Sequence, residues 1–289
     1  MPEASVVIAT RDRAAALSAC LAALADQTAA GRFEVIVVDN GSSDDTAGVV
    51  AAAGPLATRV FVADPNRGKA RNAGIAKARA PLVIFCDDDT LAPHGFVAAH
   101  LAAHGGASDR VVSGPIINVP DAQHLAPVSA ANYSRAFFCT CNVSASKAAL
   151  DAAGGFDEAF DLYGWEDTDL GVRLRASGMR RVFAWDAYIY HVKPPSSMTL
   201  ERRLALAREK GEMAARFVRK SPTWAVKLAT GAYAANFARA AIANAPPLRR
   251  LYQRVAGSGN QLTGAPALAA QALADAAYID ALRAALRDG

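Results

Sequence analysis

Three consecutive aspartates, Asp87, Asp88 and Asp89, follow the apolar run of residues 82–85. Neighbouring carboxylates repel one another unless a cation or strong hydrogen-bond donors neutralise them. Mg²⁺ and Mn²⁺ prefer oxygen ligands, and Mg²⁺ is commonly held between one or two carboxylates and the phosphates of a substrate. The segment therefore indicates a divalent-metal site, and the alternative is a loop whose acids cap the next helix.

Two other polar segments have compositions suited to a nucleotide. Asp39 ends an apolar run and is followed by an Asn-Gly turn, so its carboxylate is placed to accept a hydrogen bond from a base or a ribose. Arg67, Lys69 and Arg71 put three cations at the start of a predicted helix, where phosphate is attracted. The alternative for the Asp39 segment is a turn that caps the next helix, and the alternative for Arg67, Lys69 and Arg71 is a solvated basic first helical turn.

A second acidic pair, Glu166 and Asp167, stands at a predicted helix start directly after Gly164 and Trp165. Acids are favoured there by the helix dipole alone, but the same pair can supply a general base, with Trp165 shaping a pocket wall. His191 lies in a run typical of a strand, where a lone histidine is more often structural. Beside an aspartate site it becomes a candidate metal ligand.

The elements that must position these residues alternate between strands and helices over the first hundred residues. Apolar runs predict strands at 5–9, 35–38, 60–62 and 82–85, and the segments between them predict helices at 14–25, 43–53 and 69–78. Near-continuous apolar strands are typical of a parallel sheet that is buried on both faces. The order predicts an α/β fold with a doubly wound sheet, which binds ligands at the carboxyl ends of its strands.

The regular alternation of predicted strands and helices ends after residue 107, which indicates a second subregion with strands of mixed direction. The patterns predict strands at 110–119 and 137–144, helices at 147–153 and 167–176, and a mostly helical stretch at 199–243 with a break near Ser221-Pro222. Pro246-Pro247 and Gly257-Ser258-Gly259 indicate linkers, and residues 265–287 predict a terminal helix.

The charge of the chain is unevenly distributed. The 289 residues carry a net charge of +4 and are 52% apolar, which suits one large domain or a core with an appendage. Residues 199–289 contain 14 Lys/Arg and 6 Asp/Glu, a balance of +8, and residues 1–198 contain 17 and 21, a balance of −4. A basic tail indicates an anionic partner, such as a membrane surface or a nucleic acid, and the alternative is a solvated helix face.

Apolar residues four positions apart lie among the basic residues of this tail, in the pairs Leu200/Leu204, Met213/Phe217, Trp224/Leu228 and Tyr233/Phe237. Such helices can lie on an anionic membrane, pack on the rest of the chain or form a homo-oligomer. Nucleic-acid binding is disfavoured, because the Lys/Arg residues are dispersed and few aromatic residues lie between them.

The sequence also bears on the cellular compartment. The N-terminus lacks the charged-then-apolar pattern of a signal peptide, and no uncharged apolar run reaches the roughly 18–20 residues that span a bilayer. We therefore expect a cytoplasmic protein, with peripheral contact at the inner face of the cell membrane as an option. Four cysteines, Cys20, Cys86, Cys139 and Cys141, have neither zinc-site nor redox spacing, which indicates free thiols.

Taken in this order, the segments resemble family 2 glycosyltransferases of the GT-A fold. The resemblance covers roughly residues 4–195 and rests on blocks at 6–13, 34–42, 66–74, 85–89, 154–158 and 165–167. Asp87 and Asp89 fit the two acids of the family's DxD motif. The chain departs from the family at Arg11-Asp12, where an aromatic residue and Asn are common.

The resemblance implies a metal-dependent inverting transfer of a sugar from a UDP-, dTDP- or GDP-linked donor to a hydroxyl of a glycan or lipid-linked acceptor, in cell-surface polysaccharide, glycolipid or glycan synthesis. It implies Mn²⁺ or Mg²⁺ as cofactor. The implied roles are catalytic base for Asp167, with Glu166 second; metal ligands Asp87, Asp89 and His191; donor contacts Thr10, Arg11, Asp39, Gly68, Arg71, Asp87 and Asp88; and acceptor contacts Asn142 and Trp165.

The same resemblance divides the chain into a GT-A domain at 1–198, with a nucleotide-sugar half at 1–107 and an acceptor half at 108–198, and a basic helical extension at 199–289. Two other functions share parts of the pattern. A sugar-phosphate nucleotidyltransferase is expected to carry a Gly-rich loop after the first strand, but residues 10–13 contain no glycine. A non-catalytic sugar-nucleotide or glycan binding module would tolerate loss of the base, yet Asp89 and Asp167 are both present.

Overall fold

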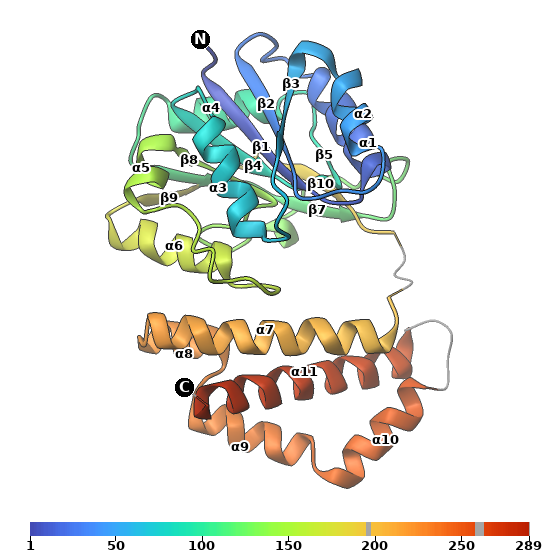
Figure 1. Ribbon diagram of the computed structural model, residues 1–289. Coiled ribbons are helices and arrows are strands. Elements are labelled where there is room, and N and C mark those ends of the chain that lie inside the picture. Colours follow the sequence, from blue (N-terminus) through green and yellow to red (C-terminus); the bar gives the residue numbers. More distant parts are fainter. Residues whose placement is uncertain (195–197, 258–262, 289) are drawn as a thin grey trace. The chain divides into compact units, whose positions relative to one another are not determined.

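The computed structural model describes residues 1–194, 198–257 and 263–288. The chain forms two compact units, shown as ribbons in Figure 1. Unit 1 comprises Met1–Asp161 and Glu166–Pro195, and unit 2 comprises Leu162–Trp165 and Ser196–Gly289. The segment Leu162–Trp165 therefore belongs to unit 2, whereas the sequence prediction placed it in the first domain.

Unit 1 is built on a seven-stranded mixed sheet. Its strand order is β3 (Ala57–Phe61), β2 (Phe33–Asp39), β1 (Ala4–Thr10), β4 (Leu82–Cys86), β8 (Asn142–Ser146), β6 (Arg110–Ser113) and β9 (Arg180–Phe183). The first four strands are parallel, and β8 runs antiparallel to both of its neighbours. This arrangement confirms the predicted α/β fold with a mixed, doubly wound sheet.

Helices cover both faces of this sheet (Figure 1). One face packs against α1 (Ala14–Ala25), α2 (Thr46–Ala52) and α4 (Phe96–His104), and the other against α3 (Arg67–Lys77), α5 (Lys147–Ala152) and α6 (Glu166–Ala176). Successive strand residues point to opposite faces, so Val7 and Ile8 of β1 are both fully buried but belong to different cores. Two short 3₁₀ helices, Gly54–Leu56 and Ala130–Asn132, lie in connecting segments.

The single strand predicted at 110–119 was wrong, because the structure divides it into β6 and β7 (Ile116–Val119) in different sheets. The chain bends at Gly114-Pro115, and a Cβ at Gly114 would lie 1.9 Å from the backbone oxygen of Ala187. Only glycine permits this close approach of two backbones. Proline next to it cannot donate a ladder hydrogen bond.

A second, three-stranded sheet places His191. Its order is β5 (Thr90–Leu91), β10 (Ile189–Val192) and β7, with β10 antiparallel to β5. The register pairs His191 with Thr90, the residue that follows Asp89. The strand pairing therefore brings the histidine next to the triple aspartate, across about a hundred residues of sequence.

Unit 2 is helical. It contains the segment Leu162–Trp165 and helices α7 (Leu200–Lys220), α8 (Trp224–Thr230), α9 (Ala234–Ala243), α10 (Pro246–Ala256) and α11 (Gly264–Arg287). A Cβ at Gly211 of α7 would lie 2.4 Å from the backbone oxygen of Tyr278 in α11, so these two long helices pack closely. None of the helices in the described residues has the length and apolarity needed to cross a bilayer.

One sequence prediction for the tail needs correction. Pro246 and Pro247 do not form a linker; they begin α10, where proline is tolerated because the first helical N–H groups have no partner within the helix. For the pair Met213/Phe217, the structure selects one of the three options given above, because both residues are buried by packing within unit 2. The Gly257-Ser258-Gly259 linker falls partly outside the described residues.

Candidate active site

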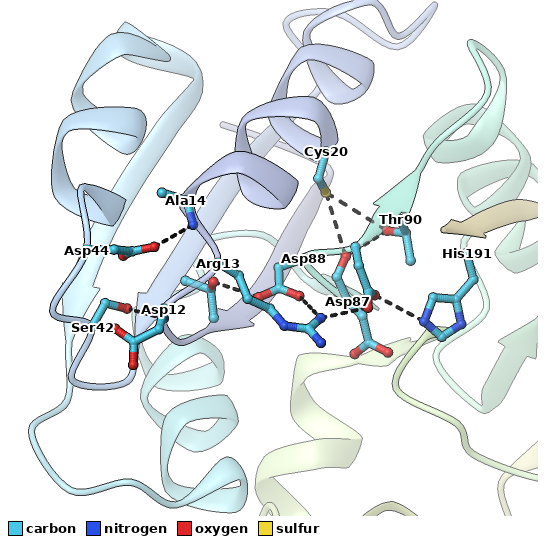
Figure 2. A network of polar contacts seen from close by, with 12 residues as sticks. Asp12, Arg13, Ala14, Cys20, Ser42, Asp44, Asp87, Asp88, Thr90 and His191 are labelled. Atoms are coloured by element: carbon cyan, nitrogen blue, oxygen red, sulfur yellow. Dashed lines mark hydrogen bonds and ion pairs between the residues drawn. The ribbon is translucent and has the colours of Figure 1, made fainter. Parts of the chain in front are cut away.

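The three aspartates follow β4 and turn in different directions. Asp88 is buried, and its two oxygens accept hydrogen bonds from Thr10 Oγ1 at 2.7 Å and from Arg13 Nη1 at 3.0 Å (Figure 2). Burial raises the pKa of Asp88, and the bonds from Thr10 and Arg13 oppose that shift. Asp88 therefore anchors the loop to the end of β1, and both of its oxygens are already engaged by this chain.

Asp89 lies between a cation and an imidazole. Arg13 Nη1 is 2.6 Å from its Oδ2, and His191 Nε2 is 3.1 Å from its Oδ1. Burial alone would raise the pKa of Asp89, but His191 and Arg13 lower it below the usual value. Within the described part of the chain, Oδ1 accepts no well-aligned hydrogen bond despite the nearby nitrogen.

This spacing fits a shared divalent ion. Two ligands that each lie about 2.1 Å from one ion, at right angles, are about 3.0 Å apart. The Asp89–His191 separation of 3.1 Å matches that geometry. Asp87 supplies a further oxygen: its carboxylate, His191 and the Cys141 thiol have ligand atoms within 4.8 Å of one another. Among the described residues, Asp87, Cys141 and His191 therefore have ligand atoms close enough together for one divalent cation, and Asp89 contacts this set through His191.

Arg71 connects the aspartate loop to the second acidic pair. This buried side chain donates a 2.9 Å hydrogen bond from Nη1 to Glu166 Oε1, and its Nη2 lies 3.9 Å from Asp87 Oδ1. Helix α3 can bring Arg71 here because Gly74 lets it approach β1, where a Cβ would meet Val7 at 2.4 Å. The guanidinium thus lies between carboxylates from two distant parts of the sequence.

Asn72, the next residue in α3, fixes the loop that precedes α6. Its Nδ2 donates to the Phe156 oxygen at 2.9 Å, and its Oδ1 accepts from the Phe156 N–H at 2.7 Å. These paired bonds to the backbone hold the Gly155-Phe156 turn against α3. They explain why blocks 66–74 and 154–158 of the sequence meet in the fold.

Asp167 has the electrostatic character of a general base. Burial and the charge of Glu166 raise the pKa of Asp167 to about 6, against the opposing effect of Arg71. A catalytic base is most effective when its pKa lies near the working pH. Perturbed carboxyl groups of this kind mark candidate functional sites.

Trp165, directly before this pair, has a strained backbone with a φ of 76°. A non-glycine residue in this region is uncommon and is kept only where its surroundings require it. In unit 2 the indole Nε1 donates to the Lys210 oxygen at 3.0 Å, and the ring lies 5.8 Å from that of Phe217. An acceptor contact for Trp165 remains a proposal.

Several predicted donor and acceptor residues are already occupied by contacts within the chain. Asp39 is 1% exposed and is held by Arg59, whose Nε lies 3.0 Å from its Oδ2. Asn142 is 1% exposed; its amide donates to the Pro115 and Ala187 oxygens, and its oxygen contacts His100 Nε2. For Asn142 this burial argues for a structural role in place of acceptor binding.

The remaining predicted donor residues differ in accessibility. A Cβ at Gly68 would lie 3.3 Å from Asn66 Oδ1 and 3.4 Å from Phe156 Cβ, so the start of α3 packs closely against the segment around Phe156. Thr10 is buried and bonded to Asp88. Arg11 has a side chain that is 52% exposed, and its Nε lies 3.7 Å from Asp12 Oδ2. Of these three, Arg11 alone presents its side chain to solvent.

Sequence reasoning missed Arg13 and Cys141 as site residues. Arg13 stands three residues after the end of β1, and the adjacent parallel strand β4 ends at the aspartates. Neighbouring parallel strands bring such residues together, so this signal was present. The position of Cys141 beside Asp87 depends on the pairing of β8 with β4, which no local pattern revealed.

The comparison with family models agrees with this geometry. The model described as "Glycosyl transferase family 2" matches residues 5–141, and the model described as "N-terminal domain of galactosyltransferase" matches residues 123–195. Residues 5–141 belong to glycosyl transferase family 2. Together, the two matches span the aspartate loop, Arg71, Glu166, Asp167 and His191.

Similar proteins carry related names. Validoxylamine A glucosyltransferase of Streptomyces hygroscopicus subsp. jinggangensis (strain 5008) is 32% identical over 275 residues, which cover 78% of this chain and 64% of that protein. Hyaluronan synthase of Pasteurella multocida is 25% identical over 239 residues, 66% of this chain and 24% of that protein. The chain thus spans less than two thirds of the length of these relatives.

Two solved structures share the fold. The mannosyltransferase PcManGT from Pyrobaculum calidifontis, in complex with GDP-Man and Mn²⁺, superposes with a TM-score of 0.63 at 19% identity, covering 99% of this chain and 87% of that one. S. aureus TarS 1-349 gives a TM-score of 0.59 at 20% identity, covering 100% and 91%. At this level of identity the likeness is one of fold.

Proposed function

We propose that this protein is a divalent-metal-dependent, inverting glycosyltransferase that moves a hexosyl group from a nucleoside-diphosphate sugar to an acceptor hydroxyl. The observation that carries the proposal is the position of Arg71, which lies 2.9 Å from Glu166 Oε1 and 3.9 Å from Asp87 Oδ1. Arg71 thus lies near Asp87, which we propose as a metal ligand, and near Glu166, the neighbour of the candidate base Asp167.

At the metal end, Asp87, Asp89 and His191 would hold Mn²⁺ or Mg²⁺. When bound, such an ion stabilises the negative charge that develops on the leaving diphosphate. Arg13 keeps Asp89 in place through the 2.6 Å contact to its Oδ2. Arg71 adds a buried positive charge on the same side as Asp87, where it can face a phosphate oxygen.

At the opposite end, Asp167 would accept the proton of the acceptor hydroxyl. Inversion requires the hydroxyl to attack the anomeric carbon from the face opposite the diphosphate, so a base is needed on that face. Its pKa of about 6 leaves Asp167 mainly ionised at neutral pH. Glu166 is bound to Arg71 and therefore acts as a positioning residue for Arg71 and Asp167.

The names of related proteins suggest which nucleotide-sugar donors to test first. The curated relatives at 32% identity are glucosyltransferases, and solved neighbours contain GDP-Man or UDP with Mn²⁺. We therefore propose a UDP-, GDP- or dTDP-linked hexose, with glucose as the first sugar to test. Arg11, at the exposed end of β1, is the residue we assign to the nucleotide side.

The C-terminal unit supports a proposal of peripheral contact with an anionic membrane. Helix α10 exposes Leu248 and Leu251, which are 38% and 51% exposed, among Arg249, Arg250 and Arg254. An amphipathic helix with apolar and basic residues can lie in the interface of an anionic bilayer.

The proposed activity can be tested by incubating the protein with UDP-, GDP- and dTDP-glucose, Mn²⁺ and a panel of glycoside acceptors. The expected result is release of one nucleoside diphosphate and a product whose anomeric configuration, measured by NMR, is opposite to that of the donor. Asp167→Asn should remove transfer, whereas Asp151→Asn, at an exposed acid of α5, should not. A retained configuration would contradict the proposal.

A further inference from the structure

The cluster beside the aspartate loop contains a thiol in addition to carboxylate and imidazole. Asp87, Cys141 and His191 offer one oxygen, one sulfur and one nitrogen, and these ligand atoms all lie within 4.8 Å of one another. Cys141 is a free thiol, 6% exposed, next to the start of β8. Asp87 follows β4 and His191 lies in β10, so three different strands build the cluster.

This donor set differs from the one that Mg²⁺ uses. Mg²⁺ takes oxygen ligands in near-octahedral geometry and gains nothing from sulfur. Thiolate, imidazole and carboxylate are the three protein ligands of Zn²⁺, and three of them with one open position form a common zinc arrangement. Ligands at about 2.0–2.3 Å in a tetrahedron are about 3.3–3.8 Å apart, within the span of this cluster.

We propose that Asp87, Cys141 and His191 form a thiophilic metal site that binds Zn²⁺ through the Cys141 sulfur. On binding, the thiol releases its proton to solvent and the sulfur lone pair forms the bond to the ion, since a coordinated thiol is deprotonated. The fourth position is left for water or a substrate oxygen.

The consequence is competition between two kinds of ion. Asp87 and His191 belong both to this set and to the proposed Mn²⁺ or Mg²⁺ ligands, so one ion excludes the other. Zn²⁺ would therefore displace Mn²⁺ and reduce transfer. This consequence, unlike zinc binding itself, rests on the proposed function.

Co²⁺ provides the direct probe, because a Co²⁺–thiolate bond gives a near-ultraviolet charge-transfer absorption that oxygen and nitrogen ligands lack. Titration of the full chain with Co²⁺ should produce this band, and Zn²⁺ should abolish it. Cys141→Ser should lose the band and bind Zn²⁺ at least about tenfold more weakly by calorimetry, as expected when a metal ligand is removed. Cys139→Ser, at a neighbouring half-buried free cysteine, should keep both.

Absence of the band in the wild type, or its persistence in Cys141→Ser, would overturn the proposal. Thermal melting establishes that each variant is folded, and Cys141→Ala provides a second replacement without an oxygen.

Nucleotide binding distinguishes a failure of the zinc site from a failure of the proposed transferase function. If Co²⁺ shows the thiolate band but no nucleoside diphosphate stabilises the protein with Mn²⁺, the zinc site stands and the proposed transferase function fails.

Discussion

Arg71 Nη1 donates a 2.9 Å hydrogen bond to Glu166 Oε1, although 95 positions separate the two residues in sequence. Both side chains are buried, and Glu166 Oε2 has no hydrogen-bond partner among the described residues. Among the described residues, the hydrogen bond that neutralises the buried Glu166 carboxylate therefore comes from the Arg71 guanidinium. It also sets the electrostatic environment of Asp167, the residue to which we assign base catalysis.

Replacing Arg71 should destabilise the fold. Arg71→Met leaves Glu166 buried without its partner, and breaking a buried pair costs about 3–5 kcal/mol. In the double variant Arg71→Met/Glu166→Gln the buried Glu166 charge is removed together with its hydrogen-bond partner, so part of the loss should be recovered. Urea unfolding followed by circular dichroism measures both. Equal stability of the single and double variants would contradict this view of the pair.

Asp167→Asn should separate chemistry from binding. The amide cannot accept the acceptor proton, so the transfer rate should fall about 10²–10⁴-fold, while nucleoside-diphosphate affinity stays within about twofold. Steady-state kinetics and calorimetry on the same preparation measure the two quantities. Transfer at the wild-type rate would show that another group is the base.

The pH dependence follows from the raised pKa of Asp167. Because the ionised form accepts the proton, kcat/KM should be level well above pH 6 and should fall about tenfold per unit well below it. Glu166→Gln removes a charge that raises this pKa, so it should move the acidic limb to lower pH. An unchanged limb in that variant would rule out Asp167 as the titrating group.

The Thr10–Asp88 hydrogen bond should contribute to the stability of the aspartate loop. Thr10→Val keeps the side-chain shape but removes the donor from a buried carboxylate, which costs about 1–3 kcal/mol. Thr10→Ser retains the hydroxyl and is the matched control. Urea midpoints compare the two, and a valine variant as stable as the serine variant would show that the bond contributes little.

If α10 contacts the membrane, replacing its two exposed leucines should weaken the binding of the protein to anionic vesicles. Leu248→Gln with Leu251→Gln should weaken cosedimentation with phosphatidylglycerol vesicles, because it removes apolar surface that would enter the bilayer interface. Leu268→Gln, at a residue that is 75% exposed in α11, is the control. Equal sedimentation of all three proteins would assign the exposed face of α10 another role.

Local patterns were sufficient for the nucleotide-side half of the fold. The helix predicted at 14–25 has these bounds in the structure, and the four apolar runs form the parallel strands β1 to β4. Sequence patterns work there because β1, β2 and β4 are buried on both faces and each helix buries one stripe. The Asp-rich loop and the Glu166-Asp167 helix start were found for the same reason, since both are local features.

Long-range pairing accounts for what sequence reasoning missed. His191 was a candidate by residue type, but its 3.1 Å approach to Asp89 depends on the antiparallel register of β10 with β5. Asn142 had a suitable side chain for an acceptor contact, and only the fold shows that the Pro115 and Ala187 oxygens occupy its amide. Pro246-Pro247 was assigned to a linker, because a helix start and a break share the same residues.

The most direct test of a nucleotide-sugar site at the aspartate loop is a thermal-shift panel of UDP, GDP, dTDP and CDP, each with and without Mn²⁺, on the wild type and on Asp89→Asn. A ligand that binds only the folded state raises the melting temperature by mass action. We expect one nucleotide to stabilise the wild type only when Mn²⁺ is present, and Asp89→Asn to lose this effect. Stabilisation by no nucleotide, or equal stabilisation of the two proteins, would contradict a nucleotide-sugar site built on Asp89.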